Sequence, residues 1–202
     1  GDNQKAQNAT QHLAQHRPLL VQNSVGGKPA LRFDGDDTLT LATPSSLNML
    51  NSAYEMFVVA RSASPAIHLL IGGGVEEFEI NFKGDAGMRF IAAGYSAGTG
   101  ASDLGPNGNF SNGRAHVVSA RVMADTYQGV VSVDGHDSVD IVSTDSRSSN
   151  NTSLRLGMRH DASFALQGEI AEIVIYRGEL TAQERRELGR YLSTKYSIAT
   201  GY

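Results

Sequence analysis

Short runs of alternating apolar and polar residues recur along most of the chain. They lie at residues 30–33, 38–41, 54–61, 67–71, 77–82, 88–92, 115–123, 129–133, 138–142, 154–157 and 169–176. Each run is bounded by Gly, Pro, Ser, Asn or Asp, the residues that favour tight turns. The pattern predicts an all-β antiparallel sandwich. Its apolar stripes predict a core that contains Leu31, Phe33, Phe57, Val59, Val118, Ile173 and Ile175.

One segment, residues 181–196, has helical periodicity instead. Thr181 and Glu184 form the Thr-x-x-Glu pattern of a capping box, which satisfies backbone amides of a first helical turn. Residues 1–28 are rich in Asn, Gln and Ala, and we expect an extended lead-in with little regular structure that wraps the sandwich. Because no internal repeat or boundary interrupts the pattern, residues 1–202 are expected to form a single domain.

Charge and composition exclude several classes of function. The chain has 17 basic and 21 acidic residues and no block of Lys or Arg, so nucleic acid is not an expected partner. No apolar run approaches the roughly 18 residues needed to cross a bilayer, so membrane insertion is not expected. The absence of Cys is compatible with export but does not establish it.

Two stretches resemble a known family. They are Asn23-Ser-Val-Gly-Gly-Lys-Pro-Ala-Leu-Arg-Phe-Asp-Gly35, and Gly168-Glu-Ile-Ala-Glu-Ile-Val-Ile-Tyr-Arg177 followed by Leu180-Thr-Ala-Gln-Glu184. Together they resemble the laminin-G-like (concanavalin A-like lectin/glucanase) jelly-roll domains of bacterial surface and secreted proteins. The resemblance implies a two-sheet jelly-roll sandwich with one short C-terminal α-helix. It also implies an extracellular or cell-surface location within a larger multidomain chain.

Relatives with this architecture bind glycans, proteins or Ca²⁺, and some distant ones are glycanases, so the fold leaves the function open. Our first hypothesis is a non-catalytic adhesion or glycan-binding module whose partner is a glycan or a cell-surface protein. For sugar stacking, the candidate aromatic residues are Tyr95 and Phe110, at the ends of a Gly- and Ser-rich loop, and Tyr127. Each of them also fits a role as a loop anchor that packs onto the sandwich.

A carbohydrate-active enzyme on the same fold, either a glycoside hydrolase or a polysaccharide lyase, is the alternative. A retaining hydrolase needs two carboxyl groups on one strand face. Glu77 and Glu79 have the required spacing, whereas Glu169 and Glu172, three residues apart, are predicted to point to opposite faces. His68 and His116 lie within apolar strand runs, which favours a structural role for both. A ligand-free structural spacer is the third hypothesis.

Calcium is the candidate cofactor, because two turns gather carboxylates, the ligands that Ca²⁺ prefers. The first choice is Asp134 with Asp137, and the second is Asp36 with Asp37. Each turn also contains an Asp-Gly pair, which forms tight hairpins for backbone reasons alone. Turn formation therefore explains both clusters without a metal.

Overall fold

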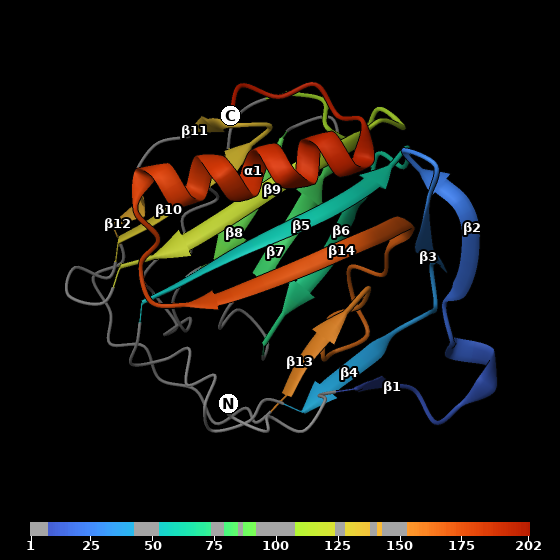
Figure 1. Cartoon of the computed structure of the whole chain (residues 1–202). Coiled ribbons are helices and arrows are strands. Elements are labelled where there is room, and N and C mark those ends of the chain that lie inside the picture. Colours follow the sequence, from blue (N-terminus) through green and yellow to red (C-terminus); the bar gives the residue numbers. More distant parts are fainter. Residues whose placement is uncertain are drawn as a thin grey trace, which may run out of the picture.

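The computed structural model describes residues 8–42, 53–73, 79–84, 87–91, 108–123, 128–137, 141–142 and 153–202. Two antiparallel sheets pack face to face, and one helix lies across the outer face of the larger sheet (Figure 1). This is the predicted concanavalin A-like jelly-roll sandwich.

The six-stranded sheet has the order β1-β4-β13-β6-β7-β8. Its strands are β1 (Ala9–Thr10), β4 (Leu39–Ala42), β6 (Ile67–Gly72), β7 (Glu79–Lys83), β8 (Met88–Ile91) and β13 (Ser153–Leu156). The eight-stranded sheet has the order β11-β10-β9-β5-β14-β3-β2, with β12 also paired to β10. Its strands are β2 (Leu19–Val25), β3 (Lys28–Asp34), β5 (Tyr54–Ser62), β9 (Ala115–Val122), β10 (Gln128–Val133), β11 (His136–Asp137), β12 (Ile141–Val142) and β14 (Gln167–Arg177).

Most of the predicted strands are present, with two differences. The lead-in has more regular structure than expected, because Leu19–Val25 forms β2 at the edge of the larger sheet and a short 3₁₀ helix, η1, covers Ala14–His16. The strand predicted at residues 138–142 is described as β12, Ile141–Val142, while residues 138–140 lie outside the described part of the chain.

The buried apolar residues form two clusters. The larger cluster fills the space between the sheets and includes Phe33, Met56 and Val118. The smaller one lies between the larger sheet and helix α1 (Ala182–Tyr196), and includes Phe57 and Val59. Four of the predicted core residues are therefore buried, namely Phe33, Phe57, Val59 and Val118, whereas Leu31, Ile173 and Ile175 are partly exposed.

Strand β14 contains a β-bulge that overturns one prediction. Its pairing with β5 shifts register between Ile170 and Glu172, so that Glu169 lies opposite Arg61 and Glu172 opposite Val59. Residues 59 and 61 of β5 share one face, so Glu169 and Glu172 also share that face. The prediction of opposite faces was wrong because Ala171 is an extra residue in the strand.

The Glu169 carboxylate joins four strands on this outer face. Arg32 of β3 donates to it from Nε at 2.9 Å and Nη2 at 2.7 Å, and Arg61 of β5 donates from Nε at 2.7 Å. Ser24 of β2 donates its hydroxyl at 2.5 Å. Burial raises the pKa of Glu169, but the hydrogen bonds from Arg61, Ser24 and Arg32 outweigh burial and hold the pKa below its usual value.

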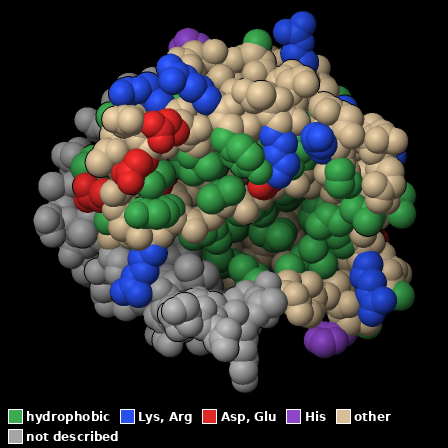
Figure 2. Space-filling model, in the orientation of Figure 1, with side chains coloured by type: hydrophobic (Ala, Val, Ile, Leu, Met, Phe, Trp, Pro, Cys, Tyr) green, Lys and Arg blue, Asp and Glu red, His purple; other side chains and the backbone are tan. Residues whose placement is uncertain are grey.

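The sandwich is open beside the second half of β14. Strand β3 pairs with residues 167–170 of β14 and no further, while β5 pairs with β14 along its whole length. Figure 2 shows a hollow with hydrophobic side chains on this face of the molecule, below α1. Ile173 and Ile175, which belong to the larger core cluster, are consequently partly exposed.

Candidate functional site

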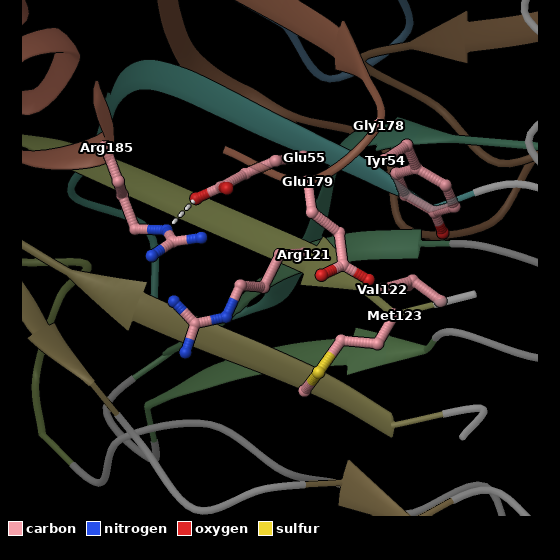
Figure 3. A pocket seen from close by; sticks show the side chains of 8 residues that line it. All are labelled: Tyr54, Glu55, Arg121, Val122, Met123, Gly178, Glu179 and Arg185. Atoms are coloured by element: carbon pink, nitrogen blue, oxygen red, sulfur yellow. Dashed lines mark hydrogen bonds and ion pairs between the residues drawn. The ribbon is translucent and has the colours of Figure 1, made fainter. Parts of the chain in front are cut away.

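A pocket of about 220 Å³ lies at one end of the larger sheet, beside the N-terminus of α1. Its walls come from the start of β5, the end of β9, the segment between β14 and α1, and the first turns of α1. The lining residues are Tyr54, Glu55, Arg121, Val122, Met123, Gly178, Glu179 and Arg185 (Figure 3).

An ion pair forms one wall of this pocket. Arg185 Nε donates to Glu55 Oε1 at 2.6 Å, and its Nη2 donates to the Leu180 carbonyl at 2.9 Å. Glu55 is 1% exposed, so its charge is almost fully removed from water. Removing one partner of such a buried pair leaves an uncompensated charge. The pair therefore holds α1 in place against β5.

The N-terminus of α1 is built to present Arg185 at this point. Thr181 accepts a hydrogen bond from Glu184 N at 3.2 Å, and Glu184 Oε2 accepts one from Thr181 N at 2.8 Å, which confirms the predicted capping box. Hydrogen bonds from the Thr181 backbone and side chain hold the pKa of Glu184 below its usual value. The cap fixes the first turn, from which Arg185 reaches back to β5.

Polar and apolar groups face the pocket from different sides. In Figure 3, Arg121 and Arg185 lie on one side and Tyr54 on the other, with the Glu179 carboxylate between them and Met123 below it. Arg121 and Glu55 are cross-strand neighbours on β9 and β5, which places both on the outer face of the sheet. The lining combines two guanidinium groups with two carboxylates, so its formal charge is balanced.

A second polar cluster lies on the outer face of the six-stranded sheet. Arg159 Nε contacts Glu79 Oε1 at 2.8 Å, and Asn81 Nδ2 donates to Glu79 Oε2 at 3.2 Å. Glu79 and Asn81 are both 0% exposed, so a glycan has no access to this carboxylate in the structure. Glu77, its expected companion, lies outside the described residues.

Asp161 also faces Arg159, with Arg159 Nη1 lying 3.8 Å from Asp161 Oδ2. A hydrogen bond from the Ser163 side chain, supported by its backbone amide and by the charge of Arg159, holds the pKa of Asp161 below its usual value. A general acid that works near neutral pH needs a raised pKa instead. Asp161 is therefore a poor candidate for proton donation.

The Asp34, Asp36 and Asp37 turn is the one group in the described part of the chain whose carboxylate oxygens approach closely enough to share a metal ion. These oxygens lie within 4.8 Å of one another. Burial, together with the neighbouring Asp34 and Asp36 carboxylates, raises the pKa of Asp37. Asp37 Oδ2 also accepts a hydrogen bond from Asp34 N at 3.1 Å, as a turn requires. Calcium at Asp36 and Asp37 stays a prediction.

The first-choice calcium turn is engaged in other contacts. Asp134 Oδ2 contacts His116 Nδ1 at 2.7 Å, and its Oδ1 accepts from Val117 N at 2.9 Å. Asp137 belongs to β11, and its side chain is not described. Calcium at Asp134 and Asp137 also stays a prediction, although both carboxylate oxygens of Asp134 already contact residues of β9.

The other candidate side chains have separate locations. Phe110 is half-buried, packs against the larger core cluster, and meets the His116 ring edge-on at 5.4 Å. Tyr95 and Tyr127 lie outside the described residues. His68 is buried, with Nδ1 at 2.6 Å from the Ala165 carbonyl, and burial lowers its pKa, as suits a structural histidine.

Sequence reasoning did not identify the pocket beside α1. Its charged pair, Glu55 and Arg185, is separated by 130 residues, so no local pattern connects the two residues. One signal was available: a charged residue at position 55 opens the most apolar strand run of the chain, so the carboxylate needed a partner from another element.

Comparison with known structures shows the fold in proteins of several kinds. A sialidase of Trypanosoma rangeli, solved in complex with sialic acid, matches with a TM-score of 0.61 and 16% identity over 86% of this chain and 28% of that one. The binding domain of botulinum neurotoxin DC, solved with rat synaptotagmin II, matches with a TM-score of 0.65 and 11% identity over 87% of this chain and 46% of that one. The chain thus spans less than half the length of either structure.

A third structure is of botulinum neurotoxin type C, whose cell entry depends on interaction with two ganglioside molecules. It matches with a TM-score of 0.65 and 12% identity over 87% of this chain and 45% of that one. No curated protein matches at a significant level. Identities this low establish a shared fold and nothing finer.

In the described residues, no helix has the length and apolar character needed to cross a bilayer. A family model, Laminin_G_3, described as the concanavalin A-like lectin/glucanases superfamily, matches residues 33–184. That span contains most of both sheets and the start of α1. The chain belongs to the concanavalin A-like lectin/glucanases superfamily.

Proposed function

We propose that this domain is a non-catalytic glycan-recognition module of a larger exported protein. The observation that carries the proposal is the pocket beside α1, where hydrogen-bond donors and acceptors converge. Guanidinium groups accept no hydrogen bonds and carboxylates donate none, so Arg121 and Glu179 together match a pair of sugar hydroxyls that must both accept and donate. Tyr54 is 3% exposed and belongs to the larger core cluster, so it closes the inner end of the pocket and does not supply a face for a sugar ring.

The balanced charge of the lining favours a neutral sugar over a strongly acidic one. Among the structural neighbours, the sialidase was solved with sialic acid, and botulinum neurotoxin type C interacts with gangliosides. These neighbours support carbohydrate as the class of ligand. The lining of the pocket supports recognition of the neutral hydroxyl groups of the sugar. The cell entry described for botulinum neurotoxin type C also supports an exported location.

Two features favour binding over catalysis. Most glycoside hydrolases use two carboxyl groups that flank the scissile bond. In the pocket, Glu55 is almost fully buried and bonded to Arg185, so it cannot approach a glycosidic oxygen. Glu179 is therefore left as the one carboxylate of the lining that is exposed to a ligand.

A glycan array followed by calorimetry on the sugars that bind tests this proposal. Glu179→Gln and Arg121→Gln are expected to weaken binding by roughly tenfold each, the cost of about one charge-assisted hydrogen bond. Two variants are matched controls. Glu187→Gln lies on the exposed surface of α1, and Arg114→Gln lies just before the first residue of β9, at the end of the strand away from the pocket. Equal losses in the controls, or release of sugar from a bound glycan, would overturn the proposal.

A further inference from the structure

The second half of β14 is exposed in a way that its position in the sheet does not explain. By strand order β14 lies between β5 and β3, well inside the larger sheet. Its neighbour β5 is buried at almost every position, but residues 171–175 of β14 are all half-buried and Tyr176 is 43% exposed. The second half of β14 is therefore exposed to solvent like an edge strand, although β14 is central in the strand order.

The backbone confirms that this stretch is an edge. Residues 172–176 pair with β5 on one side, and among the described residues no strand pairs with them on the other side. In an antiparallel sheet, alternate residues direct both N–H and C=O away from the neighbouring strand. At the bulge residue Ala171, the carbonyl already has a partner, because it accepts a hydrogen bond from Tyr196 Oη at 3.3 Å. Within the described part of the chain, the backbone groups without a strand partner therefore belong to the residues that follow the bulge.

Apolar side chains line the space next to this edge. Ile173 and Ile175 point inward from β14 and are only partly buried against the larger core cluster. Figure 2 shows the resulting hydrophobic hollow between β14 and the six-stranded sheet. Among the residues that the structure describes, the core is thus open at the same place where the backbone has no strand partner.

We propose that an extended segment of a partner polypeptide adds to the larger sheet along residues 172–176 of β14. Main-chain hydrogen bonds to the edge would hold the segment, and apolar side chains at alternate positions would fill the hollow above Ile173 and Ile175. An acyl chain could cover the apolar residues but can neither donate to nor accept from the backbone groups beside them, whereas a strand does both. The two deficits together identify the occupant as a β-strand.

This inference is independent of glycan binding, since the pocket beside α1 shares no residue with the edge at 172–176. The probe is a short synthetic peptide that alternates valine and threonine and has a lysine at each end. In NMR spectra of the isotope-labelled domain, we expect its largest shifts at residues 172–176 and at the methyl groups of Ile173 and Ile175. Alternate amides of this stretch should also exchange with solvent more slowly in its presence.

Peptides that carry N-methyl groups distinguish strand pairing from simple apolar contact. Methylating the amides along one edge of the peptide removes the donors that face β14, while methylating the other edge leaves them intact. Strand addition predicts that one of the two methylated peptides binds at least roughly tenfold more weakly than the other. Equal binding of both peptides, or no shift in β14 with millimolar peptide, would overturn the proposal.

Variants of the domain provide a second measurement. Ile175→Lys places a charge on the inner face of the edge and is expected to weaken peptide binding by roughly tenfold or more. Tyr176→Lys, at the next residue on the opposite face, is the matched control and should bind as the parent does. Thermal unfolding of both variants tests whether they are folded. Self-association that protects residues 172–176 without peptide would identify a second copy as the occupant and refute a separate partner strand.

Discussion

The Glu169 cluster predicts a large and specific loss of stability when one charge is removed. Glu169→Gln keeps the size of the side chain and one acceptor oxygen but loses the negative charge shared by Arg32, Arg61 and Ser24. The new amide group must also face donors that it cannot satisfy. Because Glu169 is 3% exposed, water cannot replace the lost interactions at the carboxylate itself.

The expected cost follows from the exposure of each partner. A hydrogen bond to a charged group contributes about 1.5–3 kcal/mol. The Arg32 and Arg61 side chains are 50% and 34% exposed, so they regain water in the variant and the full sum does not apply. We therefore expect Glu169→Gln to lower the free energy of unfolding by about 2–3 kcal/mol. For a domain of this size, that corresponds to a fall in Tm of roughly 4–12 °C.

Glu172→Gln is the matched control, because Glu172 shares the face of Glu169 on the same strand. Its partner is Lys195 at 3.0 Å, and both side chains are partly exposed, so a loss of about 1 kcal/mol or less is expected. Urea unfolding of the parent and both variants measures the difference. If the two variants lose equal stability within about 0.5 kcal/mol, the account of the Glu169 cluster is wrong.

Three further predictions concern the cap, pH and calcium. Thr181→Ala should cost about 0.5–2 kcal/mol, the usual value for a helix cap, and an unchanged denaturation midpoint would contradict it. The pKa of Glu169 is lowered in the folded protein, so the stability that its charge contributes is present above the unfolded pKa and is lost as pH falls through the folded pKa. Below about pH 4.5, the stability of the parent should therefore fall more steeply with pH than that of Glu169→Gln. Parallel curves of stability against pH would refute this prediction. Millimolar Ca²⁺ should raise the Tm relative to chelator if Asp36 and Asp37 bind it, and Asp36→Asn should abolish the rise; an identical Tm in both buffers removes the calcium prediction.

The sequence predicted the elements whose pattern is visible within a short run of residues. Alternating residues between turn formers located β3, β5 and β9, and the Thr181 to Glu184 pattern located the start of α1. Strand β2 was missed because its register breaks between Val21 and Val25 and half of its side chains face water, so it has no clean alternation. The face of Glu172 was missed because one extra residue, Ala171, reverses the alternation of everything after it.

The candidate pocket was beyond local reasoning for a different reason. Arg121, Glu179 and Arg185 each read as an ordinary solvated charge in its own segment. They converge because β9, the segment after β14 and α1 meet at one end of the sheet, which depends on the full strand order. Pairwise pattern and spacing carry no information about that order.

The two ends of the described chain differ in how they would respond to a pulling force. Strand β1 is attached to β4 by two residue pairs, which would separate one after the other, and β4 would still be held by β13. At the other end, the Tyr202 ring lies against Gly189 of α1, and Gly201 N donates to the Asp134 carbonyl at 2.7 Å. Tension would therefore release the N-terminal side first, with each freed residue adding about 3.3–3.6 Å of length. The domain would lengthen under load before the pocket beside α1 is disturbed.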